Sequence, residues 1–295
     1  MEESKAIQPG KFKTYLIFTK FRLSSLVILS AIAGYLFAGG SDITELILLT
    51  FGGIFVTGAS NGANQIWEQH LDKLMNRTNR RPLPQGWMTN KEAYSVVVIS
   101  LIIGTAMLFA INLFSALLGL FAFVSYVFIY TPMKQVSSWA VLIGAFPGAI
   151  PPFLGAIAAT NDFGLLPGVL FFVQFTWQFP HFWAIAWILH EDYQRAGFHL
   201  LPSKTGKTKN SAFQIMIYSL ALIPFSLIPW LMGWCGTVTL VLASCIGILF
   251  FLYSYKLFIT CEDKDARKLM FASFVYLPII QFVYVFDRVE PMIPK

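Results

Sequence analysis

Charged side chains are scarce in this sequence. Asp, Glu, Lys and Arg make up 12% of its 295 residues, whereas hydrophobic residues make up 56%. A soluble domain carries about 25% charged residues. Because so few charges cannot cover a globule of this size in water, the composition places the chain among membrane proteins.

Cysteine is scarce too. The three cysteines, Cys235, Cys245 and Cys261, form no CxxC pair, so we expect buried apolar packing rather than disulfides or a zinc site. The first residues contain no short apolar stretch with a cleavage site, and they mix acidic with basic residues. We therefore expect neither a secretory leader nor a mitochondrial transit peptide, but an uncleaved protein of a bacterial plasma membrane.

Long apolar runs dominate the rest of the chain. Nine of them are long enough to cross a hydrocarbon core of about 30 Å, and they cover residues 20–39, 43–67, 92–112, 114–131, 138–160, 164–189, 211–233, 236–258 and 268–286. Three prolines, Pro147, Pro151 and Pro152, interrupt the fifth run, which indicates a cavity beside it. We expect an all-α polytopic membrane protein with nine transmembrane helices around a central cavity, as one domain over residues 1–295.

The basic residues gather in alternate loops. If the short N-terminal segment 1–18 is cytoplasmic, every Lys and Arg except Arg288 and Lys295 lies on the cytoplasmic side. This distribution follows the positive-inside rule. It predicts a topology within the lipid bilayer and gives no reason to expect a nucleic-acid partner.

The most informative stretch ends the second apolar run. Asn64, Glu68 and Asp72 are spaced four apart, so on a helix they share one face, with Asn61 one turn earlier. Two such close carboxylates repel each other near a membrane unless a cation lies between them. Oxygen ligands of this kind suit Mg²⁺, which combines a few carboxylates with phosphate oxygens.

Two arginines follow this motif. Arg77 and Arg81 are again four residues apart. Guanidinium groups beside a metal site favour a clamp for a diphosphate. The alternative is an ordinary positive-inside loop next to a solvated acidic helix end.

A second polar stretch ends the sixth apolar run, where Glu191, Asp192, Tyr193 and Arg195 follow one another closely. Adjacent residues do not share a helix face, so we favour Asp192 as a metal ligand and place Glu191 second. These carboxylates would hold a second Mg²⁺ or meet the diphosphate from the opposite side. The alternative is a charged start to a loop.

His181 lies well inside the sixth run. It is nine residues before His190, which is about 13 Å deeper along a helix. An ionisable group inside a membrane predicts function, although a neutral histidine bonded between helices is the alternative. His70 and His199 have no ligand spacing, and we expect them in surface loops.

These motifs resemble those of a known family. The run NQIWEQHLDKLMNRTNRRPLP, residues 64–84, is similar to the first motif of the UbiA-type intramembrane prenyltransferases, Asn-x3-Asp-x3-Asp followed by Arg-Thr-x-x-Arg-Pro-Leu, with Glu68 where Asp is usual. WQFPHFWAIAWILHEDYQRAGFHLLP, residues 177–202, resembles the heme O synthase branch of that family. TKFRLSSLV, YTPMK and GAFPGAIPPFLG support the resemblance; Phe21 and His190 depart from its usual Pro and Lys or Arg.

The resemblance implies the fold and the activity. It implies a Mg²⁺-dependent transfer of a farnesyl group from farnesyl diphosphate to a vinyl group of heme b, which gives heme O for terminal oxidases, with the site toward the cytoplasmic face. Heme A synthase is a candidate partner. The implied metal and catalytic residues are Asn64, Glu68, Asp72, Arg77, Arg81 and His181, and the implied substrate-binding residues are Asn61, Lys20, Arg22, Lys134, Tyr193 and Arg195.

Several points stay open at this stage. His181 would place the porphyrin, handle a proton or bind iron. A related prenyltransferase with an aromatic acceptor, 4-hydroxybenzoate or a naphthoate, would keep the first motif but carry a second Asp-rich repeat. A transporter would carry its acidic groups near the membrane midplane, whereas the acids here gather at one face.

Overall fold

The computed structural model describes residues 9–203 and 205–289. Residues 1–8 of the predicted N-terminal segment, Lys204 and Lys295 therefore lie outside the described residues. The regular elements, in chain order, are α1 (Lys11–Phe18), α2 (Phe21–Phe37), α3 (Ile43–Trp67), α4 (Gln69–Asp72), α5 (Asn90–Ile111), α6 (Leu113–Val124), the π-helix η1 (Ser125–Tyr130), α7 (Thr131–Val136), α8 (Ala140–Thr160), α9 (Leu165–Ile188), α10 (His190–Arg195), α11 (Lys209–Ser226), α12 (Ile228–Leu231), α13 (Thr237–Thr260) and α14 (Asp263–Phe286).

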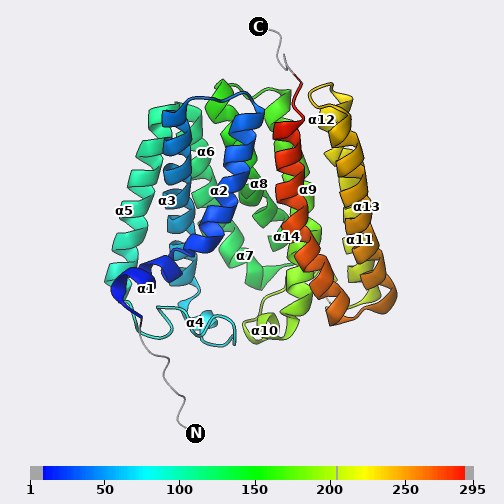
Figure 1. The fold of residues 1–295 in the computed structure, drawn as a ribbon. Helices are drawn as coiled ribbons and strands as arrows, with labels where there is room; N and C mark the ends of the chain where they lie inside the picture. The colour runs from blue at the N-terminus through cyan, green and yellow to red at the C-terminus, as the bar shows by residue number, and fades with distance from the viewer. Residues whose placement is uncertain (1–8, 204, 290–295) are drawn as a thin grey trace.

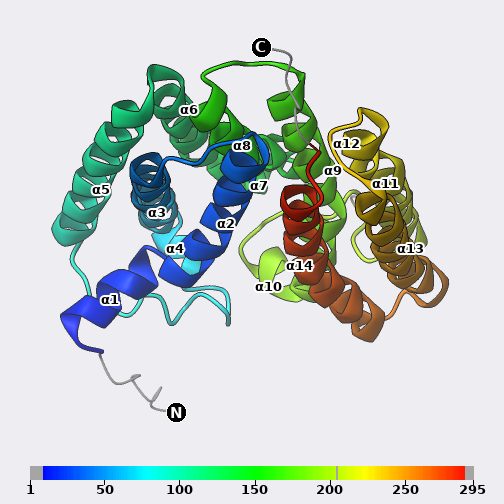
Figure 2. The same cartoon turned by 45° about the horizontal axis from the view of Figure 1, so that its top comes forward.

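The all-α prediction is confirmed for the described part of the chain. The long helices run side by side, and the short helices α4 and α10 lie together at one end of the bundle (Figure 1). Contacts of α2 with α8, α8 with α9, α9 with α14, and α14 with α2 close a ring of four helices. Other long helices flank this ring on two sides, with α3 and α5 on one and α11 and α13 on the other (Figure 2).

The predicted number of nine spans is too high by the criteria of length and apolarity. In the described residues, seven helices satisfy them, or eight if α1 and α2 form one span. The predicted sixth run is α9, which is as long as its neighbours but carries Gln174, Gln178 and His181. All three side chains are buried. Because protein rather than lipid surrounds most of α9, this helix tolerates polar residues that a lipid-facing span would exclude.

The bundle begins with a helix that the sequence analysis did not assign. The sequence predicts a short segment before the first span without assigning its structure, and Lys11–Phe18 of that segment form the helix α1, which meets α2 at an angle of 50°. The break falls at Lys20, whose backbone is left-handed with φ of 49°. The kink positions the Lys20 side chain at the wall of the central cavity.

A proline in α8 leaves one backbone carbonyl inside the bundle without its helical hydrogen bond. Pro152 has no N–H, so the carbonyl of Gly148, four residues earlier, lacks its usual helical donor. The amide of Gln174 donates to this carbonyl at 2.6 Å. Gln281 of α14 in turn donates to the Gln174 carbonyl oxygen at 2.7 Å. Neighbouring helices therefore satisfy the freed backbone group, as the proline pattern predicts.

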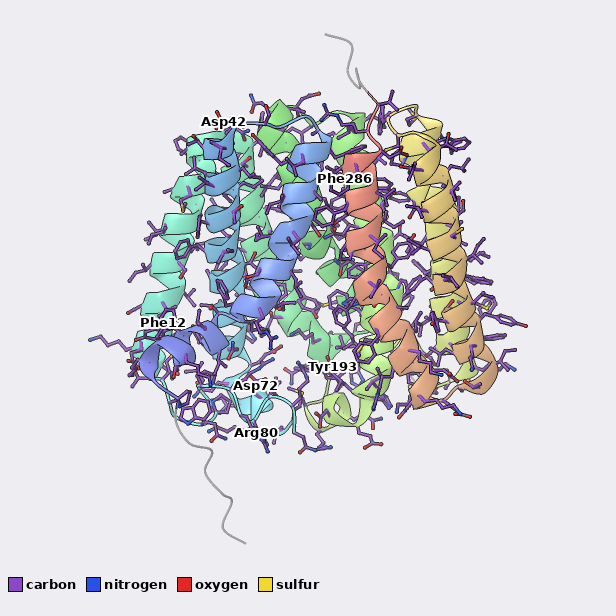
Figure 3. The ribbon with its side chains drawn as sticks, viewed as in Figure 1. Phe12, Asp42, Asp72, Arg80, Tyr193 and Phe286 are labelled. Carbon is purple, nitrogen blue, oxygen red and sulfur yellow. The ribbon has the colours of Figure 1, made fainter. Side chains whose placement is uncertain are left out.

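The two ends of the bundle differ in chemistry. Asp42 and Phe286 lie at one end, and Asp72, Arg80 and Tyr193 lie at the opposite end (Figure 3). The second end carries the polar motifs identified in the sequence.

Candidate active site

A cavity of about 460 Å³ lies between α2, α3, α8, α9 and α14. Asn64, Glu68 and Asp72 line one wall of it. The helix is interrupted at Glu68, between α3 and α4, yet the three side chains still reach the same space. They are 1%, 3% and 0% exposed, respectively, so their charges and dipoles act at short range with little screening by water.

Each of these three side chains has a partner from another part of the chain. The Lys134 ammonium lies 2.7 Å from Glu68 Oε1, and the Asn64 amide donates to the Thr131 hydroxyl at 3.1 Å. Arg81 Nη1 donates to both carboxylate oxygens of Asp72, at 2.8 and 2.7 Å. Burial raises the pKa of the Asp72 carboxyl, and Arg81 opposes that rise. Neutralising partners therefore stabilise both buried carboxylates.

The polar end of the cavity has an excess of positive charge. Four basic side chains line it, against the two carboxylates Glu68 and Asp72, so the formal net charge of these six groups is +2; the four are Lys20, Arg77, Arg81 and Lys134. The Lys134 ammonium also lies 4.8 Å from the ring centre of Tyr130 and 5.5 Å from that of Phe198. Such a site favours a ligand with several negative charges, and guanidinium forks match phosphate oxygens well.

The carboxylates of the second polar stretch lie elsewhere. Asp192 accepts the backbone N–H groups of Asn76 and Arg77, each at 3.2 Å, and pairs with Arg195 at 3.2 Å. It therefore orients the loop that carries Arg77 and is not a cavity wall residue. Glu191 is exposed and also lies away from the cavity wall. As a metal ligand, Asp192 would have to exchange these backbone donors for the ion.

The predicted substrate-binding residues divide into two groups. Lys20, Asn61, Lys134 and Tyr193 line the cavity, whereas Arg22 and Arg195 do not. Arg22 and Arg195 are exposed to the surroundings. The Asn61 amide lies within 3.4 Å of the Ser24 hydroxyl, so it also ties α3 to α2.

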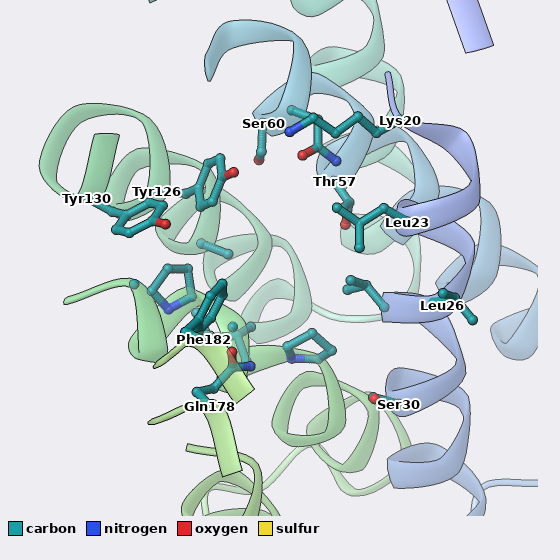
Figure 4. Close-up of a pocket in the computed structure, with 18 of the residues that line it drawn as sticks. Lys20, Leu23, Leu26, Ser30, Thr57, Ser60, Tyr126, Tyr130, Gln178 and Phe182 are labelled. Atoms are coloured by element: carbon teal, nitrogen blue, oxygen red, sulfur yellow. The ribbon is translucent and has the colours of Figure 1, made fainter. Parts of the chain in front are cut away.

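The deeper part of the cavity is mainly apolar and aromatic. Figure 4 shows Lys20 and Ser60 toward one end, and Phe182, Gln178 and Ser30 toward the other. Tyr126 and Tyr130 face the space from η1, and π-helical turns of this kind occur frequently at functional sites. His181 lines the same deep part.

The sequence analysis missed several residues that complete this site. Thr131, Gln174 and Gln281 form buried hydrogen bonds around the cavity. The signal for Thr131 was present in the run YTPMK, beside the predicted Lys134. The two glutamines carried a weaker signal: Gln174 is one of several polar residues in its apolar run, and Gln281 is a polar residue near the end of another.

The donor atoms at the polar end fit Mg²⁺ supplied with a phosphate ligand. No group of three or more His, Cys, Asp or Glu side chains within the described ranges is arranged to hold a metal by itself. The cavity instead offers two carboxylates and one amide on the same wall. Mg²⁺ is usually bound through one or two carboxylates, water and substrate phosphates rather than by a complete protein cage.

Comparison with known proteins agrees with this geometry. Residues 27–276 match the model of the UbiA prenyltransferase family. A protoheme IX farnesyltransferase from Cytophaga hutchinsonii is 48% identical over 283 residues, which cover 95% of this chain and 99% of that protein.

Solved structures share the fold. Digeranylgeranylglyceryl phosphate synthase has a TM-score of 0.77 at 20% identity, over 94% of this chain and 98% of the other. A UbiA homolog from Archaeoglobus fulgidus bound to GPP and Mg²⁺ has a TM-score of 0.66 at 16% identity, over 92% and 99% of the two chains. This polytopic membrane protein therefore belongs to the UbiA prenyltransferase family.

Proposed function

We propose that this protein transfers a farnesyl group from farnesyl diphosphate to a vinyl group of heme b, producing heme O and diphosphate. One observation carries the proposal: a cationic end with two buried carboxylates and a deep aromatic end belong to the same cavity. The first end suits a diphosphate and the second a flat apolar acceptor. The 48% identity to a protoheme IX farnesyltransferase supports this choice of substrates.

The polar end binds and activates the donor in this proposal. Mg²⁺, when bound by Asn64, Glu68 and Asp72, supplies Lewis-acid neutralisation of the diphosphate oxygens. Arg77 and Arg81 contact the same oxygens and stabilise the charge that develops on the leaving group. Lys20 and Lys134 complete the positive surface of the site.

The apolar end protects the reactive carbon chain. Breaking the carbon–oxygen bond of farnesyl diphosphate releases diphosphate and leaves an allylic cation, which the surrounding aromatic faces stabilise. A cavity that excludes bulk water delays the capture of this cation by water. The heme vinyl group donates its electron pair to the cation, and one water then adds while a proton is lost, which gives the hydroxyethylfarnesyl group.

The proposed setting is a bacterial inner membrane with the N-terminus in the cytoplasm. The positive-inside distribution of Lys and Arg supports this orientation. In this orientation the polar end of the cavity would face the cytoplasm. The chain acts as one domain over residues 1–295, and heme A synthase is the proposed partner that takes up the product.

The test is a direct conversion. Purified full-length protein in detergent is incubated with Mg²⁺, heme b and farnesyl diphosphate, and the extracted hemes are analysed by mass spectrometry. We expect a heme that has gained farnesyl and water. An unchanged heme beside a prenylated phenolic acceptor in a parallel reaction would instead assign the protein to another branch of the family.

Removal of the metal should stop this reaction. We expect EDTA to reduce heme O formation below detection and excess Mg²⁺ to restore it, because without the cation the carboxylates of Glu68 and Asp72 would repel the diphosphate. Heme O formation with and without EDTA, at constant heme and detergent, is the measurement. Full activity after dialysis against EDTA would contradict the proposed Mg²⁺ requirement.

Lys20 and Arg22 provide a matched pair of substitutions. Lys20 lines the cavity and Arg22, two residues away, is exposed. A charged hydrogen bond contributes about 1.5–3 kcal/mol, so we expect Lys20→Ala to raise the KM for farnesyl diphosphate by about tenfold or more. Arg22→Ala should change it less than about twofold, since exposed charges contribute little. Equal effects of the two substitutions would argue against the cavity as the diphosphate site.

A further inference from the structure

His181 is a buried polar residue in the mainly apolar part of the cavity. Its side chain is 7% exposed and lines the cavity from α9. Among the histidines in the described ranges, the other three do not line this space, and no cysteine does. His181 is therefore the one imidazole of the described residues that a molecule in the cavity would meet.

The hydrogen bonds around Ser273 determine which ring nitrogen of His181 carries the proton. Ser273 Oγ lies 2.7 Å from His181 Nδ1, and it donates its own hydrogen to the Met270 carbonyl at 2.6 Å. A serine hydroxyl has one hydrogen to donate. Ser273 must therefore accept from His181, so Nδ1 carries the hydrogen and Nε2 keeps a lone pair.

The orientation of the ring is fixed as well. Trp177 stacks on it with ring centres 4.3 Å apart and an angle of 16° between the planes. The Trp177 indole donates to the backbone carbonyl of Ser273 at 3.0 Å, so the stacking partner and the hydrogen-bond acceptor are tied together. Phe274 contacts the ring edge-on at 4.9 Å. Two helices, α9 and α14, thus hold one imidazole in the lining of the cavity, with its Nδ1 bonded to Ser273.

We propose that Nε2 of His181 binds the iron of the heme acceptor as an axial ligand and thereby positions the porphyrin. The inference rests on the proposed function, because that function supplies the heme. Histidines that bind metals through one ring nitrogen almost always donate from the other to an oxygen, which sets the tautomer and the ring orientation. Imidazole is also a common ligand of heme iron.

This ligand would place the acceptor relative to the donor. His181 lies seven residues before the end of α9 at Ile188, which corresponds to about 10 Å along the helix axis. The iron would then lie in the aromatic part of the cavity. The porphyrin edge, with its vinyl groups, would extend toward the diphosphate end, where the allylic cation forms.

Heme binding can be tested separately from catalysis. Full-length protein in detergent is titrated with heme b, and the absorption spectrum and affinity are recorded for the unmodified chain, His181→Ala, Ser273→Ala and His199→Ala. We expect His181→Ala to lose the spectrum of an imidazole-bound heme and to weaken binding by about tenfold or more, with added imidazole restoring the spectrum. Ser273→Ala should weaken binding by about 10–100-fold, the usual effect of losing the partner of a metal-bound histidine.

The controls separate this role from others. His199→Ala changes an exposed histidine and should leave spectrum and affinity unchanged. Metal-free protoporphyrin IX has the vinyl groups but no iron, so unmodified protein and His181→Ala should bind it equally well. Unchanged heme binding by a monodisperse His181→Ala protein would overturn the inference, and lost transfer activity in that case would assign His181 a proton-transfer role.

The same data distinguish the inference from the function on which it rests. If the unmodified protein binds and farnesylates heme while His181→Ala has the same heme spectrum, the inference alone fails. If the unmodified protein neither binds nor farnesylates heme, the proposed function fails, and the inference fails with it.

Discussion

Replacing Asp72 with Asn is expected to reduce farnesyl transfer by about 10²–10³-fold or more, with little change in heme binding. Asp72 is fully buried and lies at the polar end of the cavity with both oxygens engaged by Arg81. Asn keeps the size of the side chain but removes the charge that would neutralise Mg²⁺. Loss of one group that stabilises transition-state charge costs about 10²–10³ in kcat. Initial rates of heme O formation at saturating Mg²⁺ are the measurement.

A loss of activity in Asp72→Asn must be distinguished from a loss of folded protein. Removing one partner of a buried ion pair leaves the other charge uncompensated, which costs about 3–5 kcal/mol when the pair is fully buried. Arg81 is 12% exposed in the present pair, so the cost here is smaller. The double variant Asp72→Asn with Arg81→Gln removes both charges. It should fold and remain inactive, whereas recovered activity in the double variant would mean that Asp72 acts only as a partner of Arg81.

Asp162 offers a matched control. This aspartate is exposed in the loop between α8 and α9 and does not line the cavity. Asp162→Asn makes the same chemical change outside the site, so the rate should stay within about twofold, as is usual for surface substitutions. An equal loss of activity in both variants would indicate that removing one negative charge lowers the rate wherever that charge lies.

The site residues that are close together in the sequence could be predicted from it. A spacing of four predicts that Asn64, Glu68 and Asp72 face the same way, and all three do line one cavity, even though the helix is interrupted at Glu68. A helical period depends only on neighbouring residues. For that reason it predicts which side chains point together, provided that interruptions are short.

Contacts between site residues that are far apart in the sequence could not be predicted. Glu68 and Lys134 are separated by 66 residues and form an ion pair, which no local pattern encodes. Lys20 and Arg22 look equivalent in the run TKFR, but the break between α1 and α2 positions one in the cavity and leaves the other exposed. Asp192 stays a predicted metal ligand, and its contacts with two backbone N–H groups of the Arg77 loop and with Arg195 could not be predicted from the spacing.

The predicted count of nine spans and the count by length and apolarity differ at α9 for a related reason. A test of mean hydropathy treats each helix as if lipid surrounded it. The helix α9 has 24 residues, most of them covered by neighbouring helices, including Gln174, Gln178 and His181. A helix inside a bundle contacts protein, so its polar residues mark the cavity rather than the absence of a helix.

The crossing of α2 and α8 gives the second large expected effect, on stability. The two helices approach so closely that a Cβ on Gly155 would lie 1.9 Å from the backbone oxygen of Ala31, and one on Gly34 would lie 2.1 Å from that of Pro152. These contacts are with backbone atoms, which cannot rotate away as a side chain can. Any residue larger than glycine must therefore push the helices apart, in a region where small residues allow close approach.

We expect Gly155→Ala to destabilise the protein by about 3 kcal/mol, at the upper end of the usual range for overpacking. Because α2 and α8 both line the cavity, activity should fall together with stability. The measurement is the temperature at which half of the monodisperse protein is lost in detergent, determined by size-exclusion chromatography after heating.

Gly168 is the control that makes this result specific. It lies within α9, and a Cβ there would meet nothing within 4 Å. Alanine is favoured over glycine in a helix interior by roughly 0.5–1 kcal/mol, so Gly168→Ala should leave stability unchanged or raise it slightly. Opposite effects of the same substitution at the two glycines would attribute the loss to the α2–α8 contact. A Gly155→Ala protein as stable as the unmodified chain would mean that the two helices can separate at little cost, and that their close approach is not what shapes the cavity.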